Sequence, residues 1–176
     1  MQLRWKIIKL KYTGEELSEG FLKGNQYVEE LTILDGFKEI PEMAFCKCSN
    51  LKKVEIHGES VKKICKGAFS WCKNLVDVKL NEGLEEIDCG AFDYCTKLPK
   101  IEIPKSVKKI GDSAFWRCGN LADVTLQEGL EEIDETAFAS CKKLPRIEIP
   151  NSVKKIGNYV FSWCKNLEDV KDRKTE

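Results

Sequence analysis

Hydrophobic positions return along this chain in blocks of nearly constant length. Six blocks carry the motif Phe-x-x-Cys-x-x-Leu, and each motif leads into a stretch where apolar and polar residues alternate, as in a half-buried strand. Neighbouring motifs lie 23 residues apart, except for the first two, which lie 24 apart. A fixed period of this size predicts a solenoid of stacked repeats. The motif phenylalanines are Phe45, Phe69, Phe92, Phe115, Phe138 and Phe161.

Each repeat is predicted to contain a short strand, a second apolar pair and a compact turn. In the strand, Val54 and Ile56 face the core while Lys53 and Glu55 face outward. The Ala-Phe step that opens each motif begins a helical or 3-10 turn too short to be a free-standing helix. Consecutive strands pair in parallel from coil to coil. The predicted fold is an α/β solenoid with short parallel strands on one side and short helical or 3-10 turns on the other.

The repeat reaches both ends of the chain, so a single domain over residues 1–176 is predicted. Residues 1–30 form a degenerate first repeat or cap that lacks the Phe-x-x-Cys element. Residues 31–170 hold the regular repeats, and residues 171–176 form a tail. The pattern gives eight strand positions and seven turns of solenoid. One repeat has an additional residue near Gly58, where a local bulge is expected.

A second period of 46 residues is superimposed on the first. Residues 79–124 and 125–170 are identical at 30 of 46 positions. This alternation sets lysine pairs beside glutamate pairs in successive coils, and the outward strand positions form two further rows of alternating charge. Such ladders favour one register, and they leave the strand face without the one-sign field that attracts a charged ligand. The pairs are Lys62 and Lys63, Glu85 and Glu86, Lys108 and Lys109, Glu131 and Glu132, and Lys154 and Lys155.

Charge balance narrows the range of partners. The chain has 29 Lys and Arg residues and 29 Asp and Glu residues, so its formal net charge is zero. Nucleic-acid binding needs a basic patch, and a nucleic-acid partner is therefore not expected. No apolar run is long enough for membrane insertion. Lys9 and Lys11 interrupt the apolar core that a signal peptide needs. The expected location is cytoplasmic if the chain is complete, and extracellular or at the cell surface if a signal segment was removed.

The cysteines and the single histidine form no catalytic or metal-binding pattern. Six of the nine cysteines recur once per repeat, beneath the motif phenylalanine, and all nine are expected to be reduced thiols. Zinc sites use closely paired ligands, and Cys46 and Cys48 are the only close pair. His57 is the only histidine, and no phosphate-binding glycine loop is present. The sequence therefore predicts no enzyme, no cofactor, no metal and no small-molecule substrate.

The motif is most complete in the segments Phe69-Ser-Trp-Cys-Lys-Asn-Leu75 and Ile103-Pro-Lys-Ser-Val-Lys-Lys-Ile-Gly-Asp-Ser-Ala-Phe115. These segments closely resemble the BspA-like leucine-rich repeats, and the resemblance covers about residues 28–170. It implies a right-handed, curved leucine-rich-repeat solenoid with a parallel sheet on one side. Members of that family are typically bacterial and protist surface or secreted proteins that take part in adhesion and protein recognition.

Two surfaces are candidates for binding a protein partner. One is the outward strand row, and the other is a set of aromatic residues beside the motif cysteines, since aromatic residues dominate interface hot spots. Two alternatives stay open: the strand row is a self-paired, solvated face, and the aromatic rings cover grooves between coils. The strand row comprises Glu55, Lys79, Glu102, Asp123, Thr125 and Glu148. The aromatic set comprises Trp71, Tyr94, Trp116 and Trp163.

Three functions are compatible with these features. The leading prediction is a non-enzymatic protein-recognition module, including an adhesive one, that binds a protein through a solenoid surface. One alternative is a small intracellular inhibitor or effector that blocks a single protein target. The other is a structural or designed repeat scaffold, which the 46-residue regularity favours. Within the strand row, Thr125 interrupts the alternation between Glu102 and Glu148, so a modestly basic partner patch is expected there.

Overall fold

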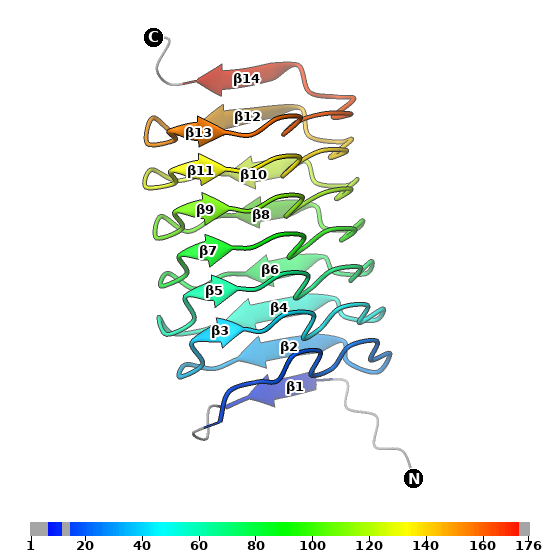
Figure 1. Cartoon of the computed structure of the whole chain (residues 1–176). Helices are drawn as coiled ribbons and strands as arrows, with labels where there is room; N and C mark the ends of the chain where they lie inside the picture. Colours follow the sequence, from blue (N-terminus) through cyan, green and yellow to red (C-terminus); the bar gives the residue numbers. More distant parts are fainter. Residues whose placement is uncertain (1–6, 12–14, 173–176) are drawn as a thin grey trace.

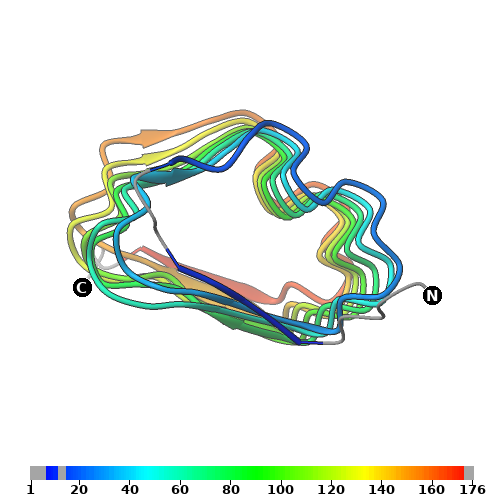
Figure 2. The ribbon, with the colours of Figure 1, turned by 90° about the horizontal axis from the view of Figure 1, so that it is seen from below.

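The computed structural model describes residues 7–11 and 15–172, which wind into one elongated solenoid (Figure 1). Seen along the solenoid axis, successive coils lie over one another (Figure 2). Each coil has a wall of longer strands, a wall of shorter strands and a wall of turns, and the apolar core fills the space between them. Parts of the predicted cap and tail, residues 1–6, 12–14 and 173–176, lie outside the described residues.

The first wall contains eight parallel strands, one at each position that the sequence pattern predicts. Val54 and Ile56 are buried in their strand, which confirms the predicted alternation. The predicted parallel pairing of neighbouring strands is confirmed except at two steps, β6 to β8 and β10 to β12, where the strands are not paired. The strands are β1 (Ile7–Leu10), β2 (Glu30–Ile33), β4 (Lys53–Ile56), β6 (Asp77–Lys79), β8 (Lys100–Glu102), β10 (Asp123–Thr125), β12 (Arg146–Ile149) and β14 (Asp169–Asp172).

Two prolines divide this wall into three hydrogen-bonded sheets, β1-β2-β4-β6, β8-β10 and β12-β14. Where strands pair, the residue before the strand donates its N–H to the preceding coil, as Val76 does to the Lys52 carbonyl at 2.9 Å. Ala122 likewise donates to the Pro99 carbonyl at 2.9 Å. Pro99 and Pro145 occupy this donor position at the two breaks, and proline has no N–H. The 46-residue period of the sequence thus reappears as a repeated break.

The second wall is a continuous parallel sheet of six two-residue strands. The first five strands each end on a fully buried core isoleucine, such as Ile64 or Ile87, whereas Ile156 at the end of the last strand is exposed. The prediction of strands on one side only was therefore incomplete, because the second apolar pair of each repeat also forms a sheet. The strands are β3 (Glu39–Ile40), β5 (Lys63–Ile64), β7 (Glu86–Ile87), β9 (Lys109–Ile110), β11 (Glu132–Ile133) and β13 (Lys155–Ile156).

The third wall consists of hydrogen-bonded turns around the motif phenylalanines, and the described residues contain no helix. The prediction of helical or 3-10 turns was wrong in this respect. Around Phe45, for example, the N–H of Ala44 bonds the carbonyl of Pro41 at 3.2 Å. However, Met43 and Lys47 have φ values of 55° and 60°. A left-handed residue on each side of the phenylalanine prevents a continuous right-handed helix.

The turns also hydrogen-bond from coil to coil, and the first coil follows the same arrangement. Leu22 takes the place of the phenylalanine, and its N–H donates to the Ala44 carbonyl at 2.6 Å. Gly20 and Gly24 supply the two left-handed positions, with φ values of 63° and 74°. Leu22 thus occupies the position that Phe45 has in the next coil, without a phenylalanine ring.

The six phenylalanines form a column of stacked rings at the centre of the core. Neighbouring ring centroids lie between 5.2 and 6.0 Å apart, with nearly parallel planes. The motif cysteines are buried beside this column, apart from the half-buried Cys164. Each donates its S–H to a backbone carbonyl of the preceding coil. Five bond the motif phenylalanine, as Cys118 does to Phe92 at 3.2 Å, and Cys48 bonds Leu22. Burial raises the pKa of the Cys118 thiol well above its ordinary value.

Candidate interaction surfaces

The long strands place the strand-row residues in the register that the sequence predicts. Within each hydrogen-bonded sheet, residues that face each other across neighbouring strands come from the predicted charge rows. The row is not continuous along the molecule, since the step from Thr125 to Glu148 coincides with the break before Pro145. The facing pairs are Lys53 and Asp77, Glu55 and Lys79, Lys100 and Asp123, Glu102 and Thr125, Arg146 and Asp169, and Glu148 and Lys171.

Glu55 is held within its own strand. The Lys53 ammonium lies 3.0 Å from a Glu55 carboxylate oxygen, and His57 Nε2 lies 3.7 Å from the other oxygen. The hydrogen bond from Lys53 lowers the pKa of Glu55 below its ordinary value. The single histidine is thus the neighbour of a surface carboxylate. Shallow hollows of about 370 and 500 Å³ lie over the two breaks, and Asp123 and Thr125 line both of them.

The lysine and glutamate pairs of the short-strand sheet form the predicted ladder through direct contacts. Lys63 lies 3.3 Å from Glu86 and 2.8 Å from Asp88. Two coils further on, Lys109 lies 3.3 Å from Glu132 and 2.8 Å from Asp134. Partial burial alone would raise the pKa of Asp134, but hydrogen bonds from Lys109 and from the next lysine of the ladder hold it below its ordinary value. The charges of this wall therefore neutralise one another.

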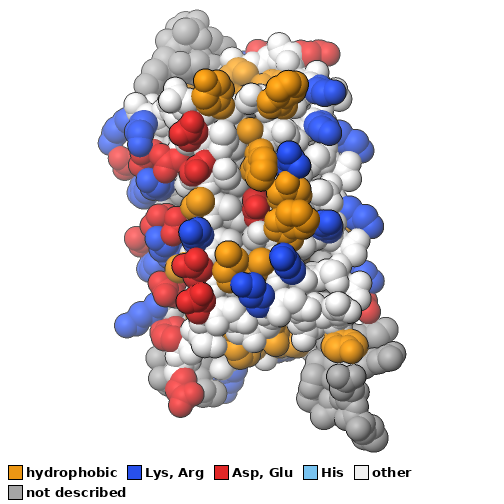
Figure 3. Space-filling view, turned by 45° about the vertical axis from the view of Figure 1, so that its right-hand side comes forward, with side chains coloured by type: hydrophobic (Ala, Val, Ile, Leu, Met, Phe, Trp, Pro, Cys, Tyr) orange, Lys and Arg blue, Asp and Glu red, His pale blue; other side chains and the backbone are white. Residues whose placement is uncertain are grey.

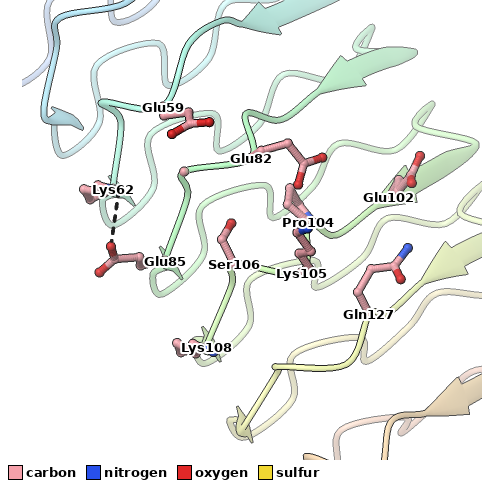
Figure 4. Close-up of a pocket in the computed structure, with 11 residues that line it drawn as sticks. Glu59, Lys62, Glu82, Glu85, Glu102, Pro104, Lys105, Ser106, Lys108 and Gln127 are labelled. Atoms are coloured by element: carbon pink, nitrogen blue, oxygen red, sulfur yellow. Dashed lines mark ion pairs between the residues drawn. The ribbon is translucent and has the colours of Figure 1, made fainter.

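A hollow of about 810 Å³ lies along the loops between the long and short strands (Figure 4). Acidic and basic side chains both line it, and Lys62 and Glu85 form an ion pair at 3.4 Å at its edge. The Ser106 hydroxyl is buried there without a hydrogen-bond partner among the described residues. In the described part of the chain, no group of three or more His, Cys, Asp or Glu side chains could hold a metal ion.

Three of the four predicted aromatic residues come together on the turn wall. The rings of Trp71 and Tyr94 stack with their centroids 4.0 Å apart, and Trp116 meets Tyr94 edge-on at 5.1 Å. We call these three residues the aromatic strip. Trp163 stands apart, because Ser140 occupies the equivalent position of the intervening coil. The side chain of Trp163 is 74% exposed. The rings of the strip thus pack against one another across the coils.

Cations cover the rings of the aromatic strip, and the sequence pattern does not predict these contacts. The guanidinium of Arg117 lies 4.6 Å from the Trp116 ring centroid and 5.1 Å from that of Tyr94. The ammonium of Lys73 lies 4.6 Å above the Trp71 ring. These distances are typical of cation–π contacts. Arg117 interrupts the aromatic column in the sequence, but in space it completes the cluster.

Two residues of the strip, and Arg117 beside it, have a backbone conformation that residues with large side chains seldom adopt. Trp71, Tyr94 and Arg117 have φ values of 61°, 56° and 59°. The left-handed region favours Gly, Asn and Asp, and it is strained for other residues. The hydrogen bonds of the turn wall impose it here, since the N–H groups of Trp71 and Tyr94 both donate to the next coil at 2.8 Å. The repeat therefore holds these side chains in fixed directions on the surface.

A band of cations borders the aromatic strip on the side of the long strands. Hydrophobic side chains gather along the turns, with Lys and Arg along one flank and mixed charges along the other (Figure 3). Residues two, four and five positions after the six motif phenylalanines include seven cations and no Asp or Glu. All seven are exposed, and none forms an ion pair within the described part of the chain. This basic flank consists of Lys47, Lys73, Lys97, Arg117, Lys142, Lys143 and Lys165.

Comparison with known proteins identifies the repeat. The model of the BspA-type leucine-rich repeat region, with six copies, matches residues 3–120 and 38–168. No curated protein matches the chain. None of the described residues belongs to a helix that could cross a membrane.

Several solved structures share the fold over most of this chain. A leucine-rich cell surface protein from Faecalibacterium prausnitzii is 31% identical over 94% of the chain, with a TM-score of 0.81. A leucine-rich repeat protein from Bacteroides ovatus is 30% identical over 98% of the chain, with a TM-score of 0.84. The chain spans 47% of the length of each of these two proteins. The leucine-rich repeat protein of T. pallidum is 25% identical, with a TM-score of 0.82, over 92% of this chain and 78% of its own.

Proposed function

Because the chain belongs to the family of BspA-type leucine-rich repeat proteins, we propose that it is a non-enzymatic protein-recognition module that contacts its partner through the aromatic strip and Arg117. Proteins of this family are not known as enzymes. One related structure is described as a cell surface protein. We place the proposed recognition at a cell surface, where it would include adhesive contact.

The observation that carries this proposal is the pre-ordered cluster of Trp71, Tyr94, Trp116 and Arg117. Trp, Tyr and Arg are the residue types that contribute most binding energy at protein interfaces. Their backbone is fixed by hydrogen bonds between coils, so little conformational entropy is lost when a partner binds.

The strand row supports this assignment by contrast. Its carboxylate Glu55 already forms an ion pair with Lys53 and lies 3.7 Å from His57, so a partner would have to displace both side chains. Facing residues in the paired strands alternate in charge, which leaves no extended one-sign field. The predicted residues Lys79, Glu102, Asp123, Thr125 and Glu148 are therefore proposed as a second, weaker contact area.

Two matched tyrosines allow a direct test of the strip. Tyr94 and Tyr159 both have left-handed backbones, with φ values of 56° and 59°, but only Tyr94 lies in the aromatic strip. Glycine relieves the backbone strain at either position, so Tyr94→Gly and Tyr159→Gly should both fold. The wild-type chain and both variants would each be immobilised and incubated with intact cells. Surface proteins that bind would be cross-linked to the immobilised chain and quantified by mass spectrometry.

We expect Tyr94→Gly to lose a reproducible captured protein and Tyr159→Gly to retain it. Equal capture by the two variants would contradict a role of the aromatic strip in binding. A wild-type chain that captures no protein above the level of an unrelated solenoid would contradict the proposed function itself.

A further inference from the structure

We infer that the partner of the aromatic strip is an acidic polypeptide segment, whose carboxylates meet the basic flank while its apolar side chains meet the edges of the rings. This inference rests on the proposed function and adds the chemical class of the partner. It also differs from the basic partner that Thr125 suggests for the strand row.

The charge distribution carries the first step. On the short-strand wall, lysines such as Lys63 and Lys109 each contact two carboxylates, so that wall is neutral. The basic flank has the same coil-to-coil spacing but no alternating acid in its columns. Asp93 is the acid beside the strip; it is half-buried, it accepts a hydrogen bond from Ser70, and burial raises its pKa. A neutral protein thus carries a local positive field along one edge, which favours an anionic partner.

The ring contacts carry the second step, the choice of a polypeptide. Single-stranded nucleic acids bind by stacking bases on free aromatic faces. Here Trp71 and Tyr94 stack on each other, Lys73 lies over Trp71, and Arg117 lies over Tyr94 and Trp116. A base or sugar ring would have to displace these groups. Carboxylates can instead bind the same cations where they stand, because a guanidinium stacked on a ring keeps its N–H edge available.

A hollow beside Arg117 supplies a specific place for one carboxylate. It measures about 400 Å³ and is lined by Tyr94, Thr96, Arg117, Gly119, Ser140 and Lys142. It exists because Gly119 and Ser140 are small at positions where other coils carry Lys or an aromatic residue. Two cations and three hydroxyl groups therefore surround a space next to the rings. Glutamate or aspartate combines the charge and the short reach that this space accommodates.

The inference is tested with a defined probe, a synthetic copolymer of glutamate and tyrosine. Binding to the wild-type chain would be followed by isothermal titration calorimetry and by tryptophan fluorescence, because Trp71 and Trp116 lie in the strip. An oligothymidylate and heparin of similar total charge serve as competing anions. The test variant is Arg117→Glu. The control Lys105→Glu makes the same change in net charge on the loop edge, where Lys105 forms no ion pair within the described residues.

We expect the copolymer to bind the wild-type chain and to bind Arg117→Glu at least about tenfold more weakly, while Lys105→Glu binds nearly as well as wild type. Binding should weaken as the salt concentration rises. Arg117→Gly guards against a folding defect, because glycine suits φ = 59° and removes the cation without reversing charge. This variant should also bind more weakly while unfolding at a similar urea concentration.

Three results would overturn the inference: no binding of the copolymer to the wild-type chain, equal losses in Arg117→Glu and Lys105→Glu, or tighter binding of the oligothymidylate or heparin than of the copolymer. None of these three results contradicts the proposed function, which is tested separately by the capture experiment. A protein captured by the wild-type chain, lost in Tyr94→Gly and indifferent to Arg117→Glu and to salt would keep protein recognition and discard the acidic partner.

Discussion

The short-strand wall and the turn wall share one repeat period but handle charge in opposite ways. On the short-strand wall, Lys109 contacts Glu132 and Asp134, so charges alternate and neutralise within the sheet. On the turn wall, the basic flank repeats the same sign in coil after coil. A repeat architecture brings equivalent positions together, so each column of the sequence becomes a stripe of the surface. The comparison teaches that a net charge of zero can conceal a surface stripe of one sign.

The largest expected effect tests the core that supports both walls. Phe115 lies in the middle of the ring column, fully buried between Phe92 and Phe138. Phe115→Ala should lower the free energy of unfolding by roughly 3–5 kcal/mol, because it removes the ring and leaves a cavity. Urea denaturation measures this loss, with the surface variant Trp116→Ala as the control. Similar unfolding curves for the two variants would contradict the assignment of the ring column as the shared core.

Replacing one cation on each wall by an acid tests directly whether the two walls differ in charge pairing. Lys109→Glu replaces two ion pairs by repulsion from Glu132 and Asp134, and should lower the free energy of unfolding by about 1–2 kcal/mol. Lys142→Glu on the basic flank removes no ion pair within the described residues and should leave stability unchanged or slightly raised. Urea denaturation at low salt provides both values. Equal losses would mean that the two walls do not differ as described.

The ladder should also leave a signature in the pH dependence of stability. Lysine hydrogen bonds hold the pKa of Asp134 below its ordinary value of 3.8. A carboxylate with a lowered folded-state pKa stabilises the protein above its unfolded-state pKa, and this stabilisation disappears as the pH falls through the folded-state value. Asp134→Asn should therefore lower the free energy of unfolding by about 0.2–1 kcal/mol at neutral pH and have no effect in strong acid. A loss that is constant with pH would point to packing instead of charge.

The smallest effect concerns the strained backbone of the turn wall. Trp163 has a φ of 63° and a 74% exposed side chain. In Trp163→Gly, the relief of strain and the greater entropy of the unfolded chain oppose each other, so the free energy of unfolding should change by less than about 1 kcal/mol. Thermal unfolding detects such a change. A large loss would show that this ring packs on the solenoid, in line with the alternative that aromatic rings cover grooves between coils.

The architecture was predictable because each position of the repeat occurs several times, so a pattern that is ambiguous in one coil becomes clear when the coils are compared. Positions such as Val54 and Ile56 recur in every coil, so the eight long strands, their parallel pairing and the buried cysteine column follow from the pattern. The short-strand sheet was missed because a two-residue strand has no alternation of its own. The turns were mistaken for helical ones because Phe and Cys three residues apart share a face in a helix and also in these turns.

The candidate surface was only partly predictable. The four aromatic residues could be found from the sequence, and Ser140 marks the gap before Trp163. The contact of Arg117 with two rings depends on side-chain positions that the pattern does not define. The basic flank was readable in principle, since its cations recur at fixed positions after each phenylalanine. It was not predicted, because a total charge of zero and the alternating rows indicated a surface without a one-sign field. The breaks at Pro99 and Pro145 were equally visible as prolines in a 46-residue period.

The most direct test of the central contrast is a two-dimensional NMR titration of the ¹⁵N-labelled chain with the glutamate–tyrosine copolymer. The account predicts that amide signals of Tyr94, Arg117 and Ser140 shift progressively, together with the side-chain indole signals of Trp71 and Trp116. Signals of Lys109 and Glu132 on the short-strand wall should stay in place, because their charges are already paired. Shifts concentrated on the short-strand wall or on the long strands, with the turn wall unchanged, would contradict the account.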